Sequence, residues 1–295
     1  MRAVLIGRSG QLARCLTASV PDGVALTAFG RGAFDLAGAP NFDGLAAGHP
    51  DVIINAAAYT AVDRAEIDRE AAFALNAQGP ARLAAFAAAR GIPLIHVSTD
   101  YVFDGCGSRP YEEDDATAPL NVYGASKLAG EQAVLSAQPR SIVLRTSWLF
   151  SAYGGNFVRT MLRLGRECDR LRVVADQTGC PTSAHDLANC IWRVAARITG
   201  SGPPFTAWGL YHYAGAGVTS WADFAQTIFA SHPCGSTGIP RIERLAGADY
   251  PALAPRPRYS VLSCAKISGS LNIRPVRWEI ALANVLKRLQ EPVQT

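Results

Sequence analysis

The chain has 295 residues, of which 49% are hydrophobic and 18% charged, and its mean hydropathy is +0.09. This composition excludes a disordered chain and provides enough apolar side chains for a sizeable core, in one large domain or two closely joined ones. The formal net charge of +4 is small for this length, so it predicts no nucleic-acid partner. A mild positive field would suit a ligand that carries phosphate, but solvated surface arginines explain the excess equally well.

Strand and helix patterns alternate through the first half of the chain. Strands are predicted at residues 3–6, 24–29, 51–55, 91–98 and 142–145, and helices at 11–19 and 123–136. An alanine-rich stretch from about 63 to 90 is predicted to be helical, with Gly79-Pro80 dividing it. Strands that alternate with helices predict a parallel sheet covered on both faces. The expected fold class is α/β, a Rossmann-type doubly wound sheet.

The second half of the chain is more irregular. Proline and glycine gather at 200–204, 232–240 and 250–258, which indicates loops, where a substrate cap usually lies. We expect residues 1–150 to form an NAD(P)-binding Rossmann domain. Residues 151–295 are expected to form mainly a smaller α/β substrate-binding region, with parts that return to the Rossmann domain.

Cysteine and histidine spacing predicts neither a disulfide framework nor a metal site. The seven cysteines contain no CxxC pair, and their odd number leaves one unpaired, which is typical of reduced thiols inside the cell. The five histidines show no HxxxH or mixed His/Cys spacing. Apolar runs fall short of the roughly 20 residues that a membrane span needs, and the N-terminal run closes with Arg8. We expect a cytoplasmic protein with no membrane partner.

A glycine-containing turn follows the first strand and opens the first helix, in the segment Gly7-Arg8-Ser9-Gly10-Gln11-Leu12-Ala13. Gly7 allows a sharp turn, and the missing Cβ of Gly10 lets a pyrophosphate approach the helix N-terminus. Two glycines alone are weak evidence. The strand before and the helix after favour a nucleotide site over a plain tight turn.

The end of the second strand, Phe29-Gly30-Arg31, has no carboxylate to hold a ribose 2′-hydroxyl. Arg31, together with Arg8, could hold a 2′-phosphate instead, which favours NADPH. An ordinary solvated arginine explains Arg31 nearly as well. The preference for NADPH over NADH is therefore a hypothesis.

Tyr123 and Lys127 are spaced to lie on one face of a helix. Reduction of a ketone needs a hydride, which a nicotinamide supplies, and a proton, which a phenol can supply. A neighbouring Lys⁺ favours the phenolate, so we expect Lys127 to lower the pKa of Tyr123 from its usual value of about 10. Thr99, at the end of a buried strand, would hydrogen-bond the substrate oxygen. The YxxxK spacing also occurs by chance on solvated helices, but its place after Ser98-Thr99-Asp100 favours catalysis.

Several segments together resemble the dTDP-4-dehydrorhamnose reductases, members of the extended short-chain dehydrogenase/reductase family. The similarity covers nearly the whole chain and is densest up to about Trp148. The segments that carry it are Gly7-Arg-Ser-Gly10-Gln11-Leu12, Asn55-Ala-Ala-Ala-Tyr-Thr-Ala-Val-Asp63, Ser98-Thr-Asp-Tyr-Val-Phe-Asp-Gly105, Pro119-Leu-Asn-Val-Tyr-Gly-Ala-Ser-Lys127, Arg145-Thr-Ser-Trp148, Asp176-Gln-Thr-Gly-Cys-Pro-Thr182 and Arg256-Pro257.

The resemblance implies hydride transfer from NADPH or NADH to the C4 ketone of dTDP-4-dehydro-L-rhamnose, giving dTDP-L-rhamnose for cell-surface polysaccharide. By the same resemblance Tyr123 is the proton donor, Lys127 supports it and binds the cofactor, and Thr99 tunes the site. Substrate contacts are expected from Thr99, Asp100, Trp148 and Arg256, although Trp148 could equally be a core aromatic. The expected cofactor site comprises Gly7, Gly10, Gln11, Leu12, Arg31, Asp35, Leu36, Ala58, Tyr59, Thr60, Val97, Tyr123 and Lys127.

The chain departs from the family pattern at a few positions. Ala13 stands where members often have a third glycine, and Gly30 where they often have an acidic residue. Some members are described as metal-bridged dimers through acidic surface residues. No acidic cluster of this chain matches that description, so Mg²⁺ is not supported by the sequence, and both a monomer and a homodimer stay open.

Three alternatives compete with the reductase. A dehydratase typically has Thr-Asp-Glu at the strand end where this chain has Tyr101 as the third residue, so the second acid is missing. An epimerase or a reductase of another nucleotide sugar stays open. A non-catalytic regulatory subunit, like that of methionine adenosyltransferase, resembles the same family, and the fold alone does not separate it from an enzyme. The presence of Thr99, Tyr123 and Lys127 favours an enzyme.

Overall fold

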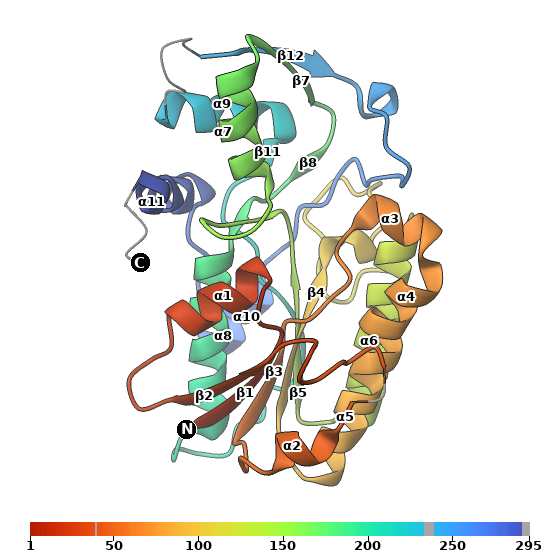
Figure 1. The fold of residues 1–295 in the computed structure, drawn as a ribbon, viewed down its shortest axis with the longest axis vertical. Helices are drawn as coiled ribbons and strands as arrows, with labels where there is room; N and C mark the ends of the chain where they lie inside the picture. The colour runs from red at the N-terminus through yellow and green to blue at the C-terminus, as the bar shows by residue number, and fades with distance from the viewer. Residues whose placement is uncertain (39, 233–238, 291–295) are drawn as a thin grey trace.

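A sheet of six parallel strands forms the base of the molecule (Figure 1). The computed structural model describes residues 1–38, 40–232 and 239–290, so most of the loop expected at 232–240 lies outside the described residues. In spatial order the strands are β10 (Gly209–His212), β5 (Ser141–Thr146), β4 (Leu94–Thr99), β3 (Val52–Asn55), β1 (Arg2–Ile6) and β2 (Ala25–Phe29). The predicted doubly wound α/β fold is confirmed.

Alternate side chains of the central strands pack into separate cores on the two faces of the sheet. On one face, Leu5 and Ile54 pack with helices α1 (Gln11–Ala18), α8 (Ala184–Thr199) and α10 (Ala265–Leu271). On the other, Val4 and Ile53 pack with α2 (Phe42–Ala46), α5 (Gly79–Ala89) and α6 (Val122–Ala137). Figure 1 shows these helix sets to either side of the strands. Because both faces of the sheet are covered by helices, the central strands have continuous apolar sequences.

The prediction that Gly79-Pro80 divides the alanine-rich helical stretch is wrong. The stretch is instead interrupted near Asp68, between α3 (Val62–Ile67) and α4 (Arg69–Phe73). After α4 it continues through a π-helical segment, Ala74–Gln78, directly into α5. Pro80 is tolerated because it lies in the first turn of α5, where the locally widened π-helical turn precedes it.

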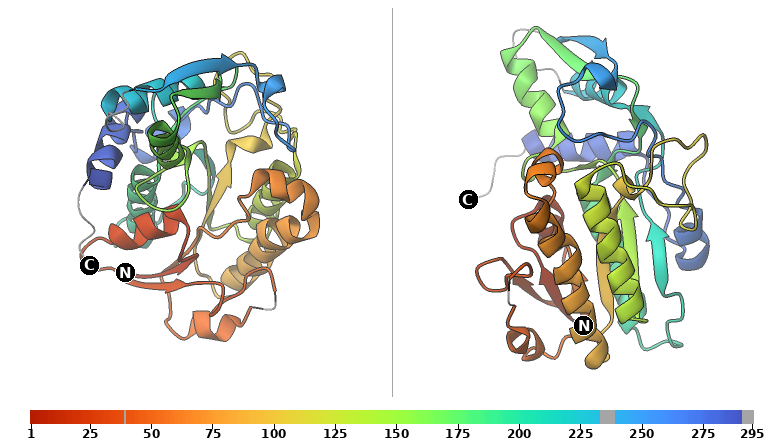
Figure 2. Two further views of the ribbon diagram at one scale, coloured as in Figure 1. Left: turned by 45° about the horizontal axis from the view of Figure 1, so that its top comes forward. Right: turned by 90° about the vertical axis from the view of Figure 1, so that its right-hand side faces the viewer.

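An upper lobe covers the carboxyl ends of the strands (Figures 1 and 2). Helices α7 (Phe157–Glu167), α9 (Trp221–Ser231) and α11 (Trp278–Gln290) share a core with β7 (Arg170–Val174), which pairs with β12 (Arg241–Leu245). Two short ladders lie nearer the sheet. Strand β6 (Leu149–Phe150) pairs with β9 (Thr182–Ser183), and β8 (Thr178–Gly179) pairs with β11 (Thr219–Ser220).

Segments of the second half return from the upper lobe to the sheet. Strand β10 pairs in parallel with β5 at the sheet edge. Helix α8 packs on α1, where the indole N–H of Trp192 donates to the Leu16 carbonyl at 3.2 Å. Short 3-10 helices at Asp100–Val102 and Gly247–Asp249 complete the described elements. The base of the molecule is therefore built from both halves of the chain.

Candidate active site

The carboxyl ends of the parallel strands open into a cavity of about 470 Å³ between the sheet and the upper lobe. Ligands of doubly wound proteins bind at this edge, near the point where the strand order reverses between β1 and β3. The cavity brings together residues from the turns after β1, β3, β4 and β5. Those that were predicted are Gly10, Gln11, Leu12, Ala58, Thr60, Val97, Thr99, Asp100, Tyr123, Lys127 and Trp148.

The turn after β1 has the geometry of a phosphate cradle. Gly7 adopts a φ of +112°, which strongly favours glycine, and its N–H donates to the Phe29 carbonyl at 2.9 Å. Gly10 is the N-cap of α1, and a Cβ there would meet no protein atom within 4 Å. Because that open space belongs to the cavity and faces the helix N-terminus, the turn fits a pyrophosphate.

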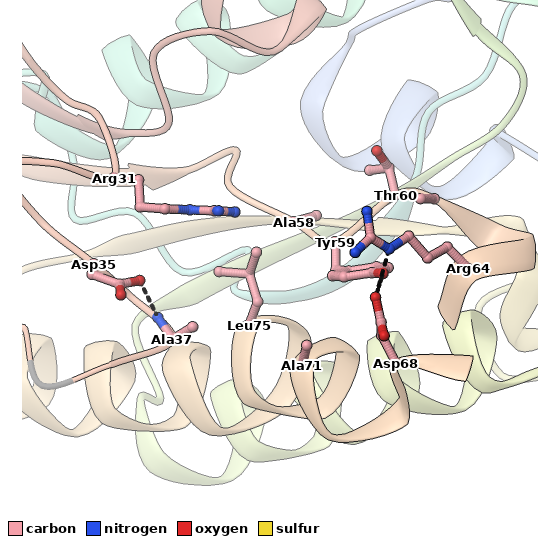
Figure 3. A pocket seen from close by; sticks show the side chains of 11 residues that line it. Arg31, Asp35, Ala37, Ala58, Tyr59, Thr60, Arg64, Asp68, Ala71 and Leu75 are labelled. Atoms are coloured by element: carbon pink, nitrogen blue, oxygen red, sulfur yellow. Dashed lines mark hydrogen bonds and ion pairs between the residues drawn. The ribbon is translucent and has the colours of Figure 1, made fainter. Parts of the chain in front are cut away.

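Two further cavities continue from this turn along the ends of β2 and β3, with volumes of about 310 and 510 Å³. Arg31 and Asp35 line both, and Figure 3 shows them in the larger one. Leu36 lines the smaller one and Tyr59 the larger one. The exposed Arg31 forms no hydrogen bond or ion pair with another described residue. Its guanidinium is therefore available to an anion at this end.

Asn76, which was not predicted from sequence, holds the loop after β3 in place. Its amide oxygen accepts from the Tyr59 N–H at 2.8 Å, and its amide nitrogen donates to the Tyr59 carbonyl at 3.0 Å and to the Ser126 hydroxyl at 2.9 Å. This fully buried side chain ties the loop to α6. An asparagine within an alanine-rich helical pattern gives no signal of such a role, since its partners are distant in sequence.

Helix α6 carries the expected catalytic pair in its first two turns. Asn121 caps the helix by accepting from the Gly124 N–H at 2.8 Å, and its amide nitrogen donates to the Pro255 carbonyl at 2.8 Å. Glu66 accepts from the Val122 N–H at 2.8 Å. These anchors fix the helix N-terminus next to β4, so that Tyr123 points into the cavity.

The pKa of Tyr123 differs from the expectation. We predicted that Lys127 lowers it, but burial raises the pKa of Tyr123 to about 12, with a smaller opposing effect from a hydrogen bond with Thr99. The negative charge of Asp100 adds to the increase. Desolvation disfavours the phenolate more than its neighbours favour it. Tyr123 is therefore a neutral phenol that holds its proton at neutral pH.

Lys127 is almost completely buried, with 2% of its surface exposed. Its ammonium group donates to the Val97 carbonyl at 2.7 Å, so the predicted cofactor residue Val97 meets the predicted catalytic lysine through its backbone. Burial lowers the pKa of Lys127 to about 8, and the Glu131 carboxylate opposes this effect. Lys127 is thus mainly charged at neutral pH and begins to lose its proton just above it.

Glu131 forms a buried ion pair with Arg145 of β5, with 2.8 Å between Oε2 and the nearest guanidinium nitrogen. The Arg145 side chain is 3% exposed and that of Glu131 2%. The guanidinium also lies over the Phe103 ring, 5.0 Å from its centroid. Helix α6 is therefore joined to the sheet by paired charges one helical turn beyond Lys127.

Two residues that line the cavity carry polar groups without protein partners. The buried hydroxyls of Ser98 and Thr146 have no hydrogen-bond partner among the described residues, and both residues line the cavity. Beside them, the Thr99 hydroxyl donates to the Asp100 carboxylate at 3.0 Å, and burial raises the pKa of Asp100 to about 7. Buried polar groups are rarely left unpaired, and these two hydroxyls lie just behind the surface of the cavity.

The far wall of the cavity is aromatic. The ring of Trp148 stacks on that of Trp221, with 3.5 Å between centroids and 5° between planes. Both residues line the cavity, as does Asn156, the N-cap of α7. The position of Trp221 was not predicted from sequence, because it lies more than 70 residues after Trp148 and the pairing of β8 with β11 brings it there.

Arg256 was predicted to contact substrate, but its guanidinium pairs with Asp63 of α3 at 2.6 Å and hydrogen-bonds Tyr101. It does not line the cavity. The Asp63 carboxylate also accepts from the N–H groups of Leu253 and Ala254, at 3.1 and 3.0 Å. Asp63 and Arg256 thus clamp the segment at 253–256 onto the lower lobe, and a substrate contact by Arg256 stays a prediction.

Asp63→Asn is expected to loosen this clamp without unfolding the protein, because nearly half of the Asp63 side chain is exposed. The backbone amides of Leu253 and Ala254 should exchange hydrogen faster, as measured by mass spectrometry on the peptide that contains them. Asp68→Asn is the control, since Asp68 pairs with Arg64 one helical turn away. Unchanged exchange in Asp63→Asn would contradict the clamp.

Neither a metal centre nor a membrane span is found in the part of the chain that the structure describes. No group of three or more His, Cys, Asp or Glu side chains there could hold a metal ion. No described helix is both long and apolar enough to cross a bilayer. The cysteines at 15, 106, 168, 180, 190 and 264 are free thiols.

The sequence profile of the family described as RmlD substrate binding domain matches residues 1–291. The chain belongs to this family. It is 44% identical over 280 residues to a protein of Sinorhizobium fredii named dTDP-4-dehydrorhamnose reductase, covering 95% of this chain and 94% of that protein. A protein of the same name from Escherichia coli K12 is 38% identical over 298 residues, with 98% of both chains covered. The family resemblance inferred from sequence is confirmed.

Solved structures agree with this assignment to the RmlD family. A crystal structure of a dTDP-4-dehydrorhamnose reductase from Clostridium acetobutylicum superposes with a TM-score of 0.91 at 33% identity, covering 99% of this chain and 100% of that one. Another from Bacillus anthracis, in complex with NADP, gives a TM-score of 0.88 at 33% identity, covering 97% and 99%. The match over full lengths includes both lobes.

Proposed function

We propose that this protein is an NADPH-dependent reductase that converts dTDP-4-dehydro-L-rhamnose to dTDP-L-rhamnose. The observation that carries the proposal is the single cavity in which Thr99, Tyr123 and Lys127 meet the phosphate-binding turn. Full-length similarity to proteins named dTDP-4-dehydrorhamnose reductase supports the substrate. We place the reaction in the cytoplasm, where nucleotide sugars and reduced coenzyme are made.

The coenzyme would lie along the trough that joins the three cavities. Gly7, Gly10 and the start of α1 would hold the pyrophosphate through backbone N–H groups. The adenosine would lie at the ends of β2 and β3, beside Asp35, Leu36 and the loop 58–60. The unpaired Arg31 would meet a 2′-phosphate, which favours NADPH over NADH. Residues 151–295 would contribute mainly to the substrate side.

The chemistry follows from how the cavity holds protons. NADPH, when bound, supplies the hydride for C4 of the sugar. Tyr123, kept neutral by its raised pKa, donates its proton to the carbonyl oxygen as negative charge develops there. Thr99 orients that oxygen. Lys127, fixed on the Val97 carbonyl, would hold the coenzyme ribose and stabilise the phenolate that remains, and solvent would then restore the proton.

The test is the oxidation of NADPH and of NADH, followed by absorbance, with dTDP-4-dehydro-L-rhamnose as substrate. Substrate-dependent oxidation that yields dTDP-L-rhamnose is expected, with a higher kcat/KM for NADPH than for NADH. The matched control is the same assay with the dTDP-sugar already reduced at C4. No turnover by folded protein that binds NADPH would reject this substrate, and equal kcat/KM values would reject the role of Arg31.

A further inference from the structure

Trp148 has an uncommon backbone for a residue with a large side chain. Its φ is +46°, in the left-handed region that side chains other than glycine rarely adopt. It lies between the end of β5 and the start of β6, where the chain passes from the sheet into the upper lobe. Such a conformation persists only where surrounding contacts determine it, and those contacts come from distant parts of the chain.

Trp221 covers one face of the Trp148 indole, since the two rings are stacked nearly parallel at 3.5 Å. The short ladder between β8 and β11 explains this position. Gly179 pairs with Thr219 and Thr178 with Ser220, so Trp221 directly follows the ladder as the first residue of α9. Its ring also contacts Phe157 of α7 at 4.6 Å, which ties the stack to the core of the upper lobe.

Gly179 lies against the other face of the Trp148 indole. A Cβ at Gly179 would come within 2.5 Å of Cε2 of Trp148, and within 2.7 and 2.8 Å of the bonded atoms Nε1 and Cζ2. A point in the ring plane, outside the ring beside Cε2, would lie nearer to Nε1 and Cζ2 than to Cε2 itself. The Cβ is instead nearest to Cε2, so it lies above the face of the ring. Because Trp221 occupies one face, Gly179 must approach the opposite one. The indole is thus enclosed on both faces and presents an edge to the cavity.

We propose that Gly179 and Trp221 are positioning residues for the nucleotide-sugar substrate, because they hold Trp148 at the sugar end of the cavity. This inference rests on the proposed function, in which Trp148 contacts the substrate. Neither tryptophan lines the cavities around Arg31 where the adenosine would lie. The pair therefore acts more on the binding of the sugar nucleotide than on that of the coenzyme.

Gly179→Ala tests the proposal, because one methyl group would displace the indole from its enclosed position. The KM for dTDP-4-dehydro-L-rhamnose should rise about tenfold or more, while the KM for NADPH changes less than about twofold. The near-ultraviolet circular dichroism of the stacked indoles should change as well. Gly269→Ala is the matched control, since a Cβ there meets no atom within 4 Å and the residue lies on α10.

Variants of Trp221 keep the proposal testable if Gly179→Ala fails to fold. Trp221→Leu should reproduce the selective rise in the sugar KM, and Trp221→Phe, which retains an aromatic face, should recover most of the loss. An unchanged sugar KM in folded Gly179→Ala or Trp221→Leu, or an equal rise in both KM values, would overturn the proposal. Lack of turnover by the wild type would instead count against the proposed function itself.

Discussion

Tyr123→Phe is expected to lower kcat for the reduction of the sugar nucleotide by about 10²–10⁴-fold, because it removes the hydroxyl that we propose as the proton donor. The affinity for NADPH should stay within about twofold, since the ring that lines the cavity is retained. Stopped-flow measurement of NADPH oxidation, with equilibrium binding of NADPH in parallel, checks both parts. The expected pattern separates loss of chemistry from loss of the binding site.

Tyr211→Phe is the control for this substitution. The Tyr211 hydroxyl donates to the Ala207 carbonyl at 2.9 Å on the edge strand β10, and the residue does not line the cavity. Its kcat should match that of the wild type. If Tyr123→Phe kept more than about a tenth of wild-type kcat, another group would have to supply the proton, and the proposed role of Tyr123 would be wrong.

Glu131→Gln is expected to lower the free energy of unfolding by about 3–5 kcal/mol, because it leaves the Arg145 guanidinium buried without its counter-charge. Chemical denaturation measures this loss. The alkaline limb of the kcat/KM profile should also move to lower pH. Glu131 raises the pKa of Lys127, so without that carboxylate Lys127 loses its proton below about 8, the value that it has in the intact protein.

A second variant separates stability from protonation. Glu131→Gln combined with Arg145→Met removes both charges and should regain much of the lost stability. The alkaline limb of the kcat/KM profile should remain shifted to lower pH, as in Glu131→Gln alone. Glu167→Gln is the matched control, since it breaks an exposed pair with Arg163 and should change stability by less than about 1 kcal/mol. A stable Glu131→Gln variant with a normal pH profile would contradict this account of the buried pair.

The sequence was sufficient for those parts of the site in which neighbours in sequence are also neighbours in space. The turn around Gly7 and Gly10 and the pairing of Tyr123 with Lys127 follow from local spacing on a strand end or a helix face. The parallel sheet covered on both faces follows from the alternation of strand and helix patterns. Side chains after β1, β3, β4 and β5 then meet at one edge, because all parallel strands end there.

What could not be predicted depends on long-range packing. Trp221 reaches Trp148 only through the pairing of two short ladder strands, and nothing in its own surroundings marks it. Arg256 has the motif of a ligand residue, but an acidic partner on α3 takes its guanidinium. The predicted direction of the Tyr123 pKa shift was wrong, because the sequence spacing indicates a nearby charge but gives no measure of how deeply the phenol is buried. Pro80 was predicted to break the helix, but the preceding π-helical turn accommodates it.

The strand β10 gives the chain a property that concerns folding more than catalysis. A fragment that ended after residue 150 would lose β10, so β5 would become an open edge with unpaired backbone groups. It would also lose α8, and the apolar face of α1 and the sheet beneath it would meet water. The first half of the chain therefore depends on the second half for its own stability, and the protein should unfold in one transition as a single cooperative unit.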